Sequence, residues 1–200
     1  MSMSVSSEGK QLASVGQDGQ LALWDFADGQ LQHRTEIASG WVEHVAWSKS
    51  SNHLAVSSGR VVTILSSSGG KIWSSENHPS TVSAIEWVTD QELSTACYGR
   101  VTFFNTSSGK ENERLEWQGS LVSLALSPDG NVVACGSQDK SVHFWRRSNV
   151  QDSMMSGYPW KPSELAFSHD SILLASGGGE DITVWSFEGN GPEGTTPGVL

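Results

Sequence analysis

A unit of about 40 residues recurs five times along this 200-residue chain, and this repeat constrains the fold more than any other feature. One series of strand-like segments ends in a large residue at spacings of 41, 39, 41 and 40: Trp24, Leu65, Phe104, Trp145 and Trp185. A second series recurs at spacings of 42, 40, 39 and 41: Val5, Trp47, Trp87, Leu126 and Phe167. Eight residues after each member of the second series stands a small residue: Ala13, Ala55, Thr95, Ala134 and Ala175. Three series in a constant relation indicate a structural repeat over the whole chain.

Each repeat has room for four short strands, which we call a, b, c and d. Strand a carries the Val5 series, strand b the alanine series and strand c the Trp24 series. Turn sequences separate them, such as SPDGN between a and b, QDG between b and c, and ADGQ between c and d. Strands a and b are almost continuously apolar or small, as in strands covered on both faces. The pattern predicts an all-β fold of stacked four-stranded antiparallel blades, a β-propeller.

The segments GKQLASVGQDGQLALWDF (residues 9–26) and SPDGNVVACGSQDKSVHFW (residues 127–145) resemble the WD-repeat family, and the resemblance extends over essentially the whole chain. In that family a strand-b Ser or Thr, an Asp of the b–c turn, the last Trp of strand c and a His ahead of strand a form a buried polar tetrad. The resemblance implies tetrad-like structural roles for nine residues: Ser14, Asp18, Trp24, His78, Asp139, Trp145, Ser176, Asp181 and Trp185. Leu65 and Phe104 replace the Trp in two repeats, and no repeat has all four members, so apolar packing must hold some blades together.

The five WD-type repeats are predicted at approximately residues 3–34, 45–75, 85–117, 124–156 and 165–200, in one propeller domain or partial propeller over residues 1–200. Five repeats are fewer than the blades with which rings of the resembled family usually close. Three interpretations stay open: a fragment of a longer protein, which we favour, a closed five-bladed ring, or an open arc completed by oligomerisation or by another chain. An open arc would expose strand edges. The stretch from Glu188, rich in Gly, Pro and Thr, is expected to be a mobile c–d loop or a linker.

Composition argues against several partners and locations. The formal net charge of −10 is the opposite of what binding to nucleic acid requires. No apolar run reaches the ~18 residues of a membrane span, and the start MSMSVSSEGK lacks the features of a secretory signal. Cys97 and Cys135 lie in apolar runs without metal-ligand spacing. We therefore expect a reduced, cytoplasmic protein with no cofactor or metal and with neither a nucleic acid nor a membrane as partner.

No catalytic motif of useful specificity is present. The six histidines are scattered over different strands and turns, and no nucleophile elbow, phosphate-binding loop or zinc-protease motif occurs. The predicted function is that of a noncatalytic scaffold which binds a protein or peptide through its b–c and d–a loop face. The alternative is a propeller enzyme or small-ligand binder acting at the channel mouth, because such sites assemble from distant blades.

Cations on three b–c turns form the first candidate binding surface. Arg60, Arg100 and Lys140 stand at nearly equivalent points of their repeats and predict a basic crescent that grips an acidic or phosphorylated peptide. The simpler interpretation is that turn tips favour long, soluble side chains.

The d–a connections supply a second candidate surface: Trp41, Tyr158, Trp160 and Lys161. Prolines on both sides of Trp160 stiffen its loop and lower the ordering cost of binding, and Trp and Tyr are favoured hot-spot residues. The alternative is that these aromatic residues cap the interface between blades. Trp47 and Trp87 lie in strand a and are predicted to be packing residues.

Overall fold

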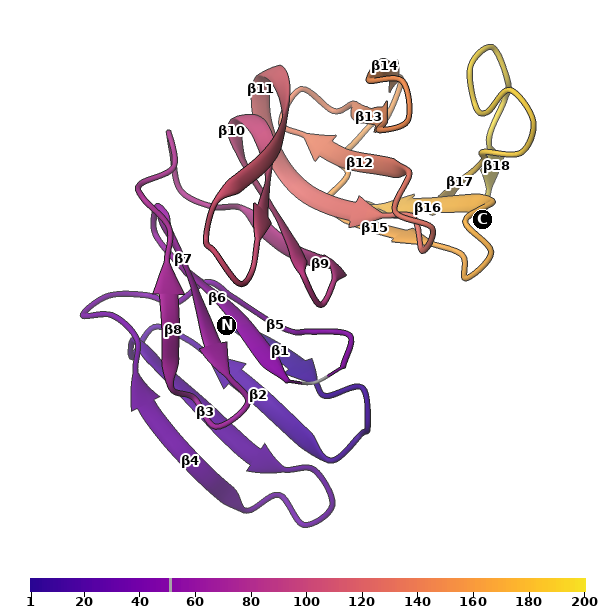
Figure 1. Cartoon of the computed structure of the whole chain (residues 1–200). Coiled ribbons are helices and arrows are strands. Elements are labelled where there is room, and N and C mark those ends of the chain that lie inside the picture. The colour runs from indigo at the N-terminus through magenta and orange to yellow at the C-terminus, as the bar shows by residue number, and fades with distance from the viewer. Residues whose placement is uncertain (51) are drawn as a thin grey trace. The chain divides into compact units, whose positions relative to one another are not determined.

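The computed structural model describes residues 1–50 and 52–200, which form strands and turns (Figure 1). No helix long and apolar enough to cross a membrane is present in this part of the chain. The chain divides into two compact parts: an N-terminal part of Met1–Cys97 with Val101–Arg114, and a C-terminal part of Tyr98–Arg100 with Leu115–Leu200. The single propeller domain or partial propeller over residues 1–200 stays a prediction.

The first two repeats are four-stranded antiparallel sheets whose strands follow in chain order. The first sheet contains β1 (Ser2–Val5), β2 (Gln11–Val15), β3 (Gln20–Asp25) and β4 (Leu31–Glu36). The second contains β5 (His44–Trp47), β6 (His53–Ser58), β7 (Val61–Ser66) and β8 (Lys71–Ser74). Strand a is therefore the first strand of each sheet and strand d the last, as the turn chemistry predicts.

The third and fourth repeats share a sheet of six strands, because each of two long strands supplies two of the predicted strands. Its strands are β9 (Ala84–Thr89), β10 (Glu92–Asn105), β11 (Glu111–Leu126), β12 (Val132–Ser137), β13 (Val142–Arg146) and β14 (Gln151–Met155). β10 supplies strands b and c of the third repeat, and β11 supplies strand d of the third and strand a of the fourth. The start of β10 pairs with β9, and Gly99, with φ of +86°, lies where β10 turns from strand b to strand c. The end of β11 pairs with β12 as strand a of the fourth repeat.

The fifth repeat is a four-stranded sheet of β15 (Glu164–Phe167), β16 (Leu173–Gly177), β17 (Thr183–Ser186) and β18 (Gly198–Val199). The five predicted WD-type repeats are thus contained in four antiparallel sheets. The predicted all-β fold of four-stranded blades is confirmed.

The c–d loop of the fifth repeat is held in place by an ion pair. Arg146, at the end of β13, donates to both carboxylate oxygens of Glu193 at 2.6 and 2.8 Å and to the carbonyl of Asn190 at 3.1 Å. The guanidinium lowers the pKa of the Glu193 carboxyl. The segment expected to be a mobile loop or linker is therefore a loop tied to the neighbouring repeat.

Apolar side chains fill the space between consecutive sheets. One cluster joins the first two repeats, a second joins β6 and β7 to β9 and β10, and a third joins β12 and β13 to β16 and β17. Trp47 and Trp87 are 7% and 3% exposed, which confirms their predicted packing role. In the N-terminal part the first strands also touch directly, since Ser4 accepts the backbone N–H of Trp47 at 3.0 Å and Trp87 donates its indole N–H to Ala46 at 3.0 Å.

The third repeat departs from the predicted spacing by one residue. Trp87 pairs with Leu93, six residues on, whereas Trp47 pairs with Leu54, seven residues on. A register shift between Glu92 and Leu93 accounts for the difference, because the pairing skips Val88 of β9 and so moves by one residue.

The shift changes the role of Thr95. Ser94, and not Thr95, takes the position of the small strand-b residue that Ala13 has in the first repeat. Thr95 therefore stands at the position of Ser14 and Ser176, the tetrad hydroxyl. The sequence analysis placed it one residue too early because it assumed a constant spacing of eight.

Candidate functional site

The first repeat joins its tetrad hydroxyl directly to its tryptophan. Trp24 donates its indole N–H to Ser14 Oγ at 2.8 Å, and both side chains are half-buried. Asp18 lies outside this pair: it is exposed, and its carboxylate accepts the backbone N–H of Gln20 at 3.3 Å.

The third repeat keeps the histidine but not the tryptophan. His78 is 3% exposed and lies between Thr95 Oγ1, 3.0 Å from Nε2, and the carbonyl of Arg60, 2.9 Å from Nδ1. The edge of its ring meets Phe104 at a centroid distance of 5.7 Å. Both ring nitrogens are thus engaged, and the imidazole is enclosed by the blade.

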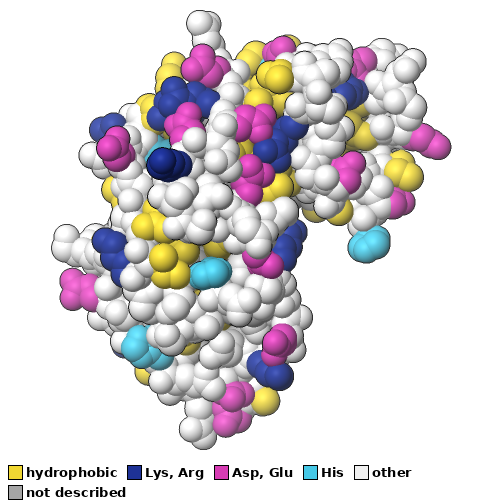
Figure 2. Space-filling model, viewed as in Figure 1, with side chains coloured by type: hydrophobic (Ala, Val, Ile, Leu, Met, Phe, Trp, Pro, Cys, Tyr) yellow, Lys and Arg dark blue, Asp and Glu magenta, His cyan; other side chains and the backbone are white. Residues whose placement is uncertain are grey.

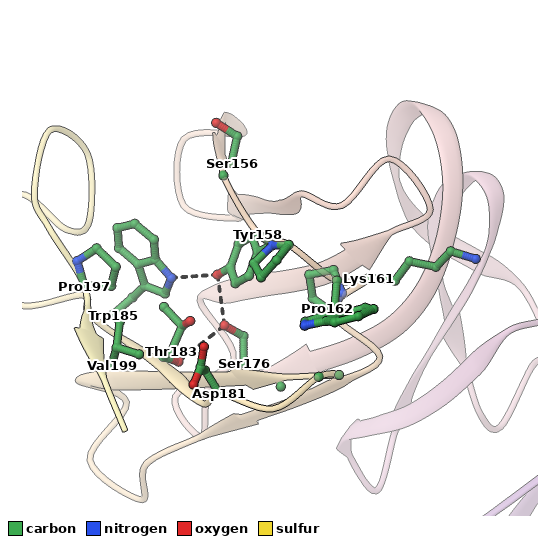
Figure 3. Close-up of a pocket in the computed structure, with 16 residues that line it drawn as sticks. Ser156, Tyr158, Lys161, Pro162, Ser176, Asp181, Thr183, Trp185, Pro197 and Val199 are labelled. Carbon is green, nitrogen blue, oxygen red and sulfur yellow. Dashed lines mark hydrogen bonds between the residues drawn. The ribbon is translucent and has the colours of Figure 1, made fainter.

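The fifth repeat inserts a tyrosine hydroxyl between serine and tryptophan. Trp185 donates its indole N–H to Tyr158 Oη at 2.7 Å, and Tyr158 Oη lies 2.9 Å from Ser176 Oγ (Figure 3). Burial raises the pKa of Tyr158, so its hydroxyl stays protonated at neutral pH. The sequence analysis assigned Tyr158 to partner binding. The structure gives its hydroxyl a structural role that the sequence analysis missed.

The fourth repeat replaces hydrogen bonds with stacked rings. Trp117 stacks on His143 at a centroid distance of 3.8 Å, and Trp145 meets the same imidazole edge-on at 4.3 Å. His143 is 1% exposed, and burial lowers its pKa to about 4. Its Nε2 lies 3.5 Å from Asp152 Oδ2, but a neutral imidazole forms no ion pair there at pH 7.

The turn aspartates lie at the surface of their blades. Asp139 accepts the N–H and the hydroxyl of Ser141 at 3.1 and 2.6 Å, which lowers the pKa of its carboxyl. Asp139 and Asp181, like Asp18, are exposed. None of the three carboxylates is therefore buried as the family resemblance implies, and their tetrad-like structural role stays a prediction. A physical reason is that the fourth and fifth repeats have Trp117 and Tyr158 where the family's His would meet the carboxylate.

The three b–c turn cations differ in how freely they present charge. Arg60 donates its Nε–H to the carbonyl of His78, and the Nε of Arg100 is buried. Lys140 is exposed at the turn tip, with φ of +67°. On the face shown in Figure 2, Lys and Arg side chains are interspersed with Asp and Glu. The crescent stays a prediction, with Arg60 and Lys140 as its exposed members.

Three residues predicted to bind a partner meet in one cavity of the C-terminal part. Residues 156–162 of the d–a connection face residues 176–179 and Asp181 of strand b and its turn, and Thr183, Trp185, Pro197 and Val199 complete the wall (Figure 3). We call this cavity, of about 190 Å³, the fifth-repeat pocket. Tyr158, Trp160 and Lys161 all line it, whereas Trp41 belongs to the N-terminal part.

Glycines let the two loops of the pocket approach each other. A Cβ on Gly178, whose φ is +144°, would lie 2.0 Å from the carbonyl oxygen of Lys161. A Cβ on Gly179 would lie 1.9 Å from Cδ1 of Trp160. The indole of Trp160 therefore rests on bare backbone, while 53% of the residue stays exposed.

Comparison with known sequences decides the family. The family described as "WD domain, G-beta repeat" matches residues 1–25 and 111–146. These segments contain the Ser14–Trp24 pair and the Trp117–His143–Trp145 stack. The chain contains WD repeats. The cross-strand pairing above therefore describes WD repeats whose tetrads have diverged.

Relatives of this WD-repeat chain include several cell-cycle proteins. Meiotic fizzy-related protein 1 of Schizosaccharomyces pombe is 28% identical over 148 residues, which cover 70% of this chain and 35% of that protein. The B-type cell cycle switch protein ccs52B of Medicago truncatula is 28% identical over 169 residues, 80% of this chain and 34% of that protein. "Cell division cycle 20.1, cofactor of APC complex" of Arabidopsis thaliana is 28% identical over 179 residues, which cover 82% of this chain and 39% of that protein. The chain thus spans little more than a third of these relatives.

A simple count locates the residue ahead of strand a in this WD-repeat chain. In the last four repeats it lies seven positions before the strand-a partner of the tetrad strand-b residue: Ala38, His78, Trp117 and Tyr158. The strand-b residues opposite are Val56, Thr95, Cys135 and Ser176. In the second repeat the small apolar Ala38 stands opposite the apolar Val56. In the third and fifth repeats a hydrogen-bonding side chain stands opposite a hydroxyl. This matching is the sequence signal by which Tyr158 could have been found, whereas Trp117, opposite Cys135, follows neither pattern.

Proposed function

We propose that this WD-repeat chain is a noncatalytic scaffold that holds a protein or peptide partner on its b–c and d–a loop face, with the fifth-repeat pocket as an anchor. One observation carries the proposal: a d–a loop and a b–c turn converge there on an aromatic cavity with Trp160 half-exposed beside it. Exposed tryptophans on loops that a rigid sheet holds in place are typical of binding hot spots.

The buried histidines do not support the enzyme alternative. His78 and His143 are 3% and 1% exposed, and each is enclosed by aromatic rings or backbone. A general acid or base must reach the proton that it transfers. These side chains therefore serve the stability of the blades.

The relatives favour the same kind of role. One of them is by name a cofactor of the APC complex, and two others are named as fizzy-related or cell-cycle switch proteins. We extend that kind of role, and no specific partner, to this chain.

A peptide library displayed on phage and selected on the full chain tests the proposal. We expect enriched peptides to bind the unaltered chain and to lose about 30-fold in affinity for Trp160→Ala, the loss of a hot-spot tryptophan. Phe26→Ala is the matched control, since Phe26 is an aromatic residue of similar exposure, 52%, in a c–d turn outside the proposed face. Peptides that bind all three proteins equally would show that the pocket is not the anchor.

The basic crescent and the cytoplasmic location remain separate predictions. Lys140→Glu weakens binding of an acidic or phosphorylated peptide if the crescent is the site, and leaves it unchanged if Lys140 is only a soluble turn residue. Selecting the library on this variant beside Trp160→Ala distinguishes the two surfaces.

A further inference from the structure

Aromatic faces dominate the fifth-repeat pocket. Tyr158, Trp160 and Trp185 line it together with prolines of the d–a loop and Pro197. The π faces of Trp and Tyr are negative and attract a cation placed over them. The tyrosine and Trp185 are fixed by their mutual hydrogen bond of 2.7 Å, so these rings are already in place before a ligand arrives.

The charged group that faces the cavity is a carboxylate. Asp181 lies with Ser176 and Thr183 on the floor of the pocket, whereas the Lys161 side chain extends away from Tyr158, Trp185 and Asp181 (Figure 3). Within the part of the chain that the structure describes, the Asp181 carboxylate has no ion-pair partner. It is exposed and open to a ligand cation.

The surroundings add charge of the same sign. Glu180 precedes Asp181 in the b–c turn and is also exposed, and the chain as a whole has a formal charge of −10. A field of this sign favours the approach of a basic partner. The cavity of about 190 Å³ has roughly six times the ~30 Å³ that one water occupies in the liquid. That volume suits one long side chain.

We propose that the fifth-repeat pocket takes a Lys or Arg side chain of the partner peptide, with the cationic head at Asp181 and the stem on the faces of Trp160 and Tyr158. This inference rests on the proposed function and names its ligand class. The occupant has the opposite charge to the acidic or phosphorylated peptide predicted for the b–c turn cations. The two surfaces therefore select different parts of a partner, or different partners.

Capped amino acids are the probes that test this inference on the full chain. N-acetyl-arginine amide and N-acetyl-lysine amide carry the cation, N-acetyl-norleucine amide is the uncharged match, and N-acetyl-glutamate amide has the opposite charge. The readout is the indole N–H signal of Trp160 and Trp185 in a proton–nitrogen NMR spectrum, assigned with Trp160→Phe and Trp185→Phe. The signal of Trp73, whose indole N–H is bonded to the carbonyl of Thr106 in the N-terminal part, is the internal control.

We expect saturable shifts of the Trp160 signal with the two basic probes and none with norleucine or glutamate. Asp181→Asn should weaken the basic probes about fivefold, as for a partly exposed charge next to aromatic faces. Asp170→Asn is the matched control, because Asp170 is an exposed turn carboxylate outside the pocket that hydrogen-bonds Ser168.

Each other result overturns the inference. Equal binding of norleucine would make the pocket an apolar anchor, and binding of glutamate would reverse its charge preference. No shift with any probe, or unchanged affinity in Asp181→Asn, would also reject a cation site. None of these results removes the proposed scaffold function, which fails separately if library peptides ignore Trp160→Ala.

Discussion

The first and fifth repeats contain the same serine and tryptophan and connect them differently. In the first repeat Trp24 reaches Ser14 directly at 2.8 Å, in a cavity of about 270 Å³ where Trp24 is the one aromatic residue of the wall. In the fifth repeat Tyr158 separates Ser176 from Trp185, and the pocket gains a second and a third aromatic wall. Strands b and c are thus alike in the two repeats.

The residue delivered by the d–a loop makes the difference. Tyr158 arrives from the connection ahead of strand a and bonds residues 18 and 27 positions further on. The loop that carries it also carries Trp160 and Lys161. Tyr158, at the His position of the tetrad, therefore both forms a structural hydrogen bond and shapes the wall of the pocket.

Removing each tryptophan should give the largest contrast. Trp185 is 8% exposed and packs in the core between β12, β13 and β16, whereas Trp24 is half-buried. We expect Trp185→Ala to cost about 3–5 kcal/mol of unfolding free energy and Trp24→Ala about half of that. Urea denaturation followed by circular dichroism measures both. Equal losses would mean that the two repeats are energetically equivalent after all.

The fourth repeat extends the contrast to a blade held by ring stacking. The pKa of His143 is about 4 in the folded chain, and an unfolded histidine titrates near 6.5. Because protonation favours the unfolded state, His143 leaves stability intact above pH 6.5 and removes up to about 3 kcal/mol as pH falls from 6.5 to 4. His143→Phe should flatten this part of the pH profile of urea midpoints. His169→Gln, at an exposed histidine, should leave it unchanged; a profile in which both variants behave alike contradicts the prediction.

A pair of equivalent glycines tests the close approach of the loops. Gly16 and Gly178 each lie two residues after the tetrad serine, but only Gly178 has a positive φ and backbone within 2.0 Å of an added Cβ. Gly178→Ala should therefore cost about 2 kcal/mol, and Gly16→Ala less than about 0.5 kcal/mol. Thermal denaturation of the two variants compares them, and similar melting points would argue against a tight contact with Lys161.

The hydroxyl of Tyr158 should have the smallest effect. Tyr158→Phe leaves the indole N–H of Trp185 without its acceptor, while Ser176 keeps its bond to the carbonyl of Thr183 at 3.3 Å. We expect a loss of about 1 kcal/mol and a displaced Trp185 indole signal in the NMR spectrum. Ser14→Ala, which removes the acceptor of Trp24, is the counterpart in the first repeat. A neutral Tyr158→Phe would show that the ring and not the hydroxyl fills the site.

Much of the fold was predictable because its signals are local. Turn sequences such as SPDGN and the recurring Trp series defined strands and repeats, and Trp47 and Trp87 are buried as predicted. The exception was Thr95, because a one-residue register shift at Glu92 leaves no mark in composition. The candidate site was predicted in part: Trp160 and Lys161 line the pocket, but the structural use of Tyr158 was missed.

The sequence by itself determined that this chain builds four-stranded WD-type blades, because periodic apolar residues and turn residues act over a few positions. The tertiary structure decided which side chains meet at the tetrad positions: Tyr158 with Ser176 in the fifth repeat, Thr95 with His78 in the third and Trp117 with His143 in the fourth. Those choices depend on loops that return across a blade, so the partners lie about 17 to 27 residues apart in the chain. Only the folded backbone brings such residues within hydrogen-bonding or stacking distance, and with them Trp160 and Asp181 into one pocket.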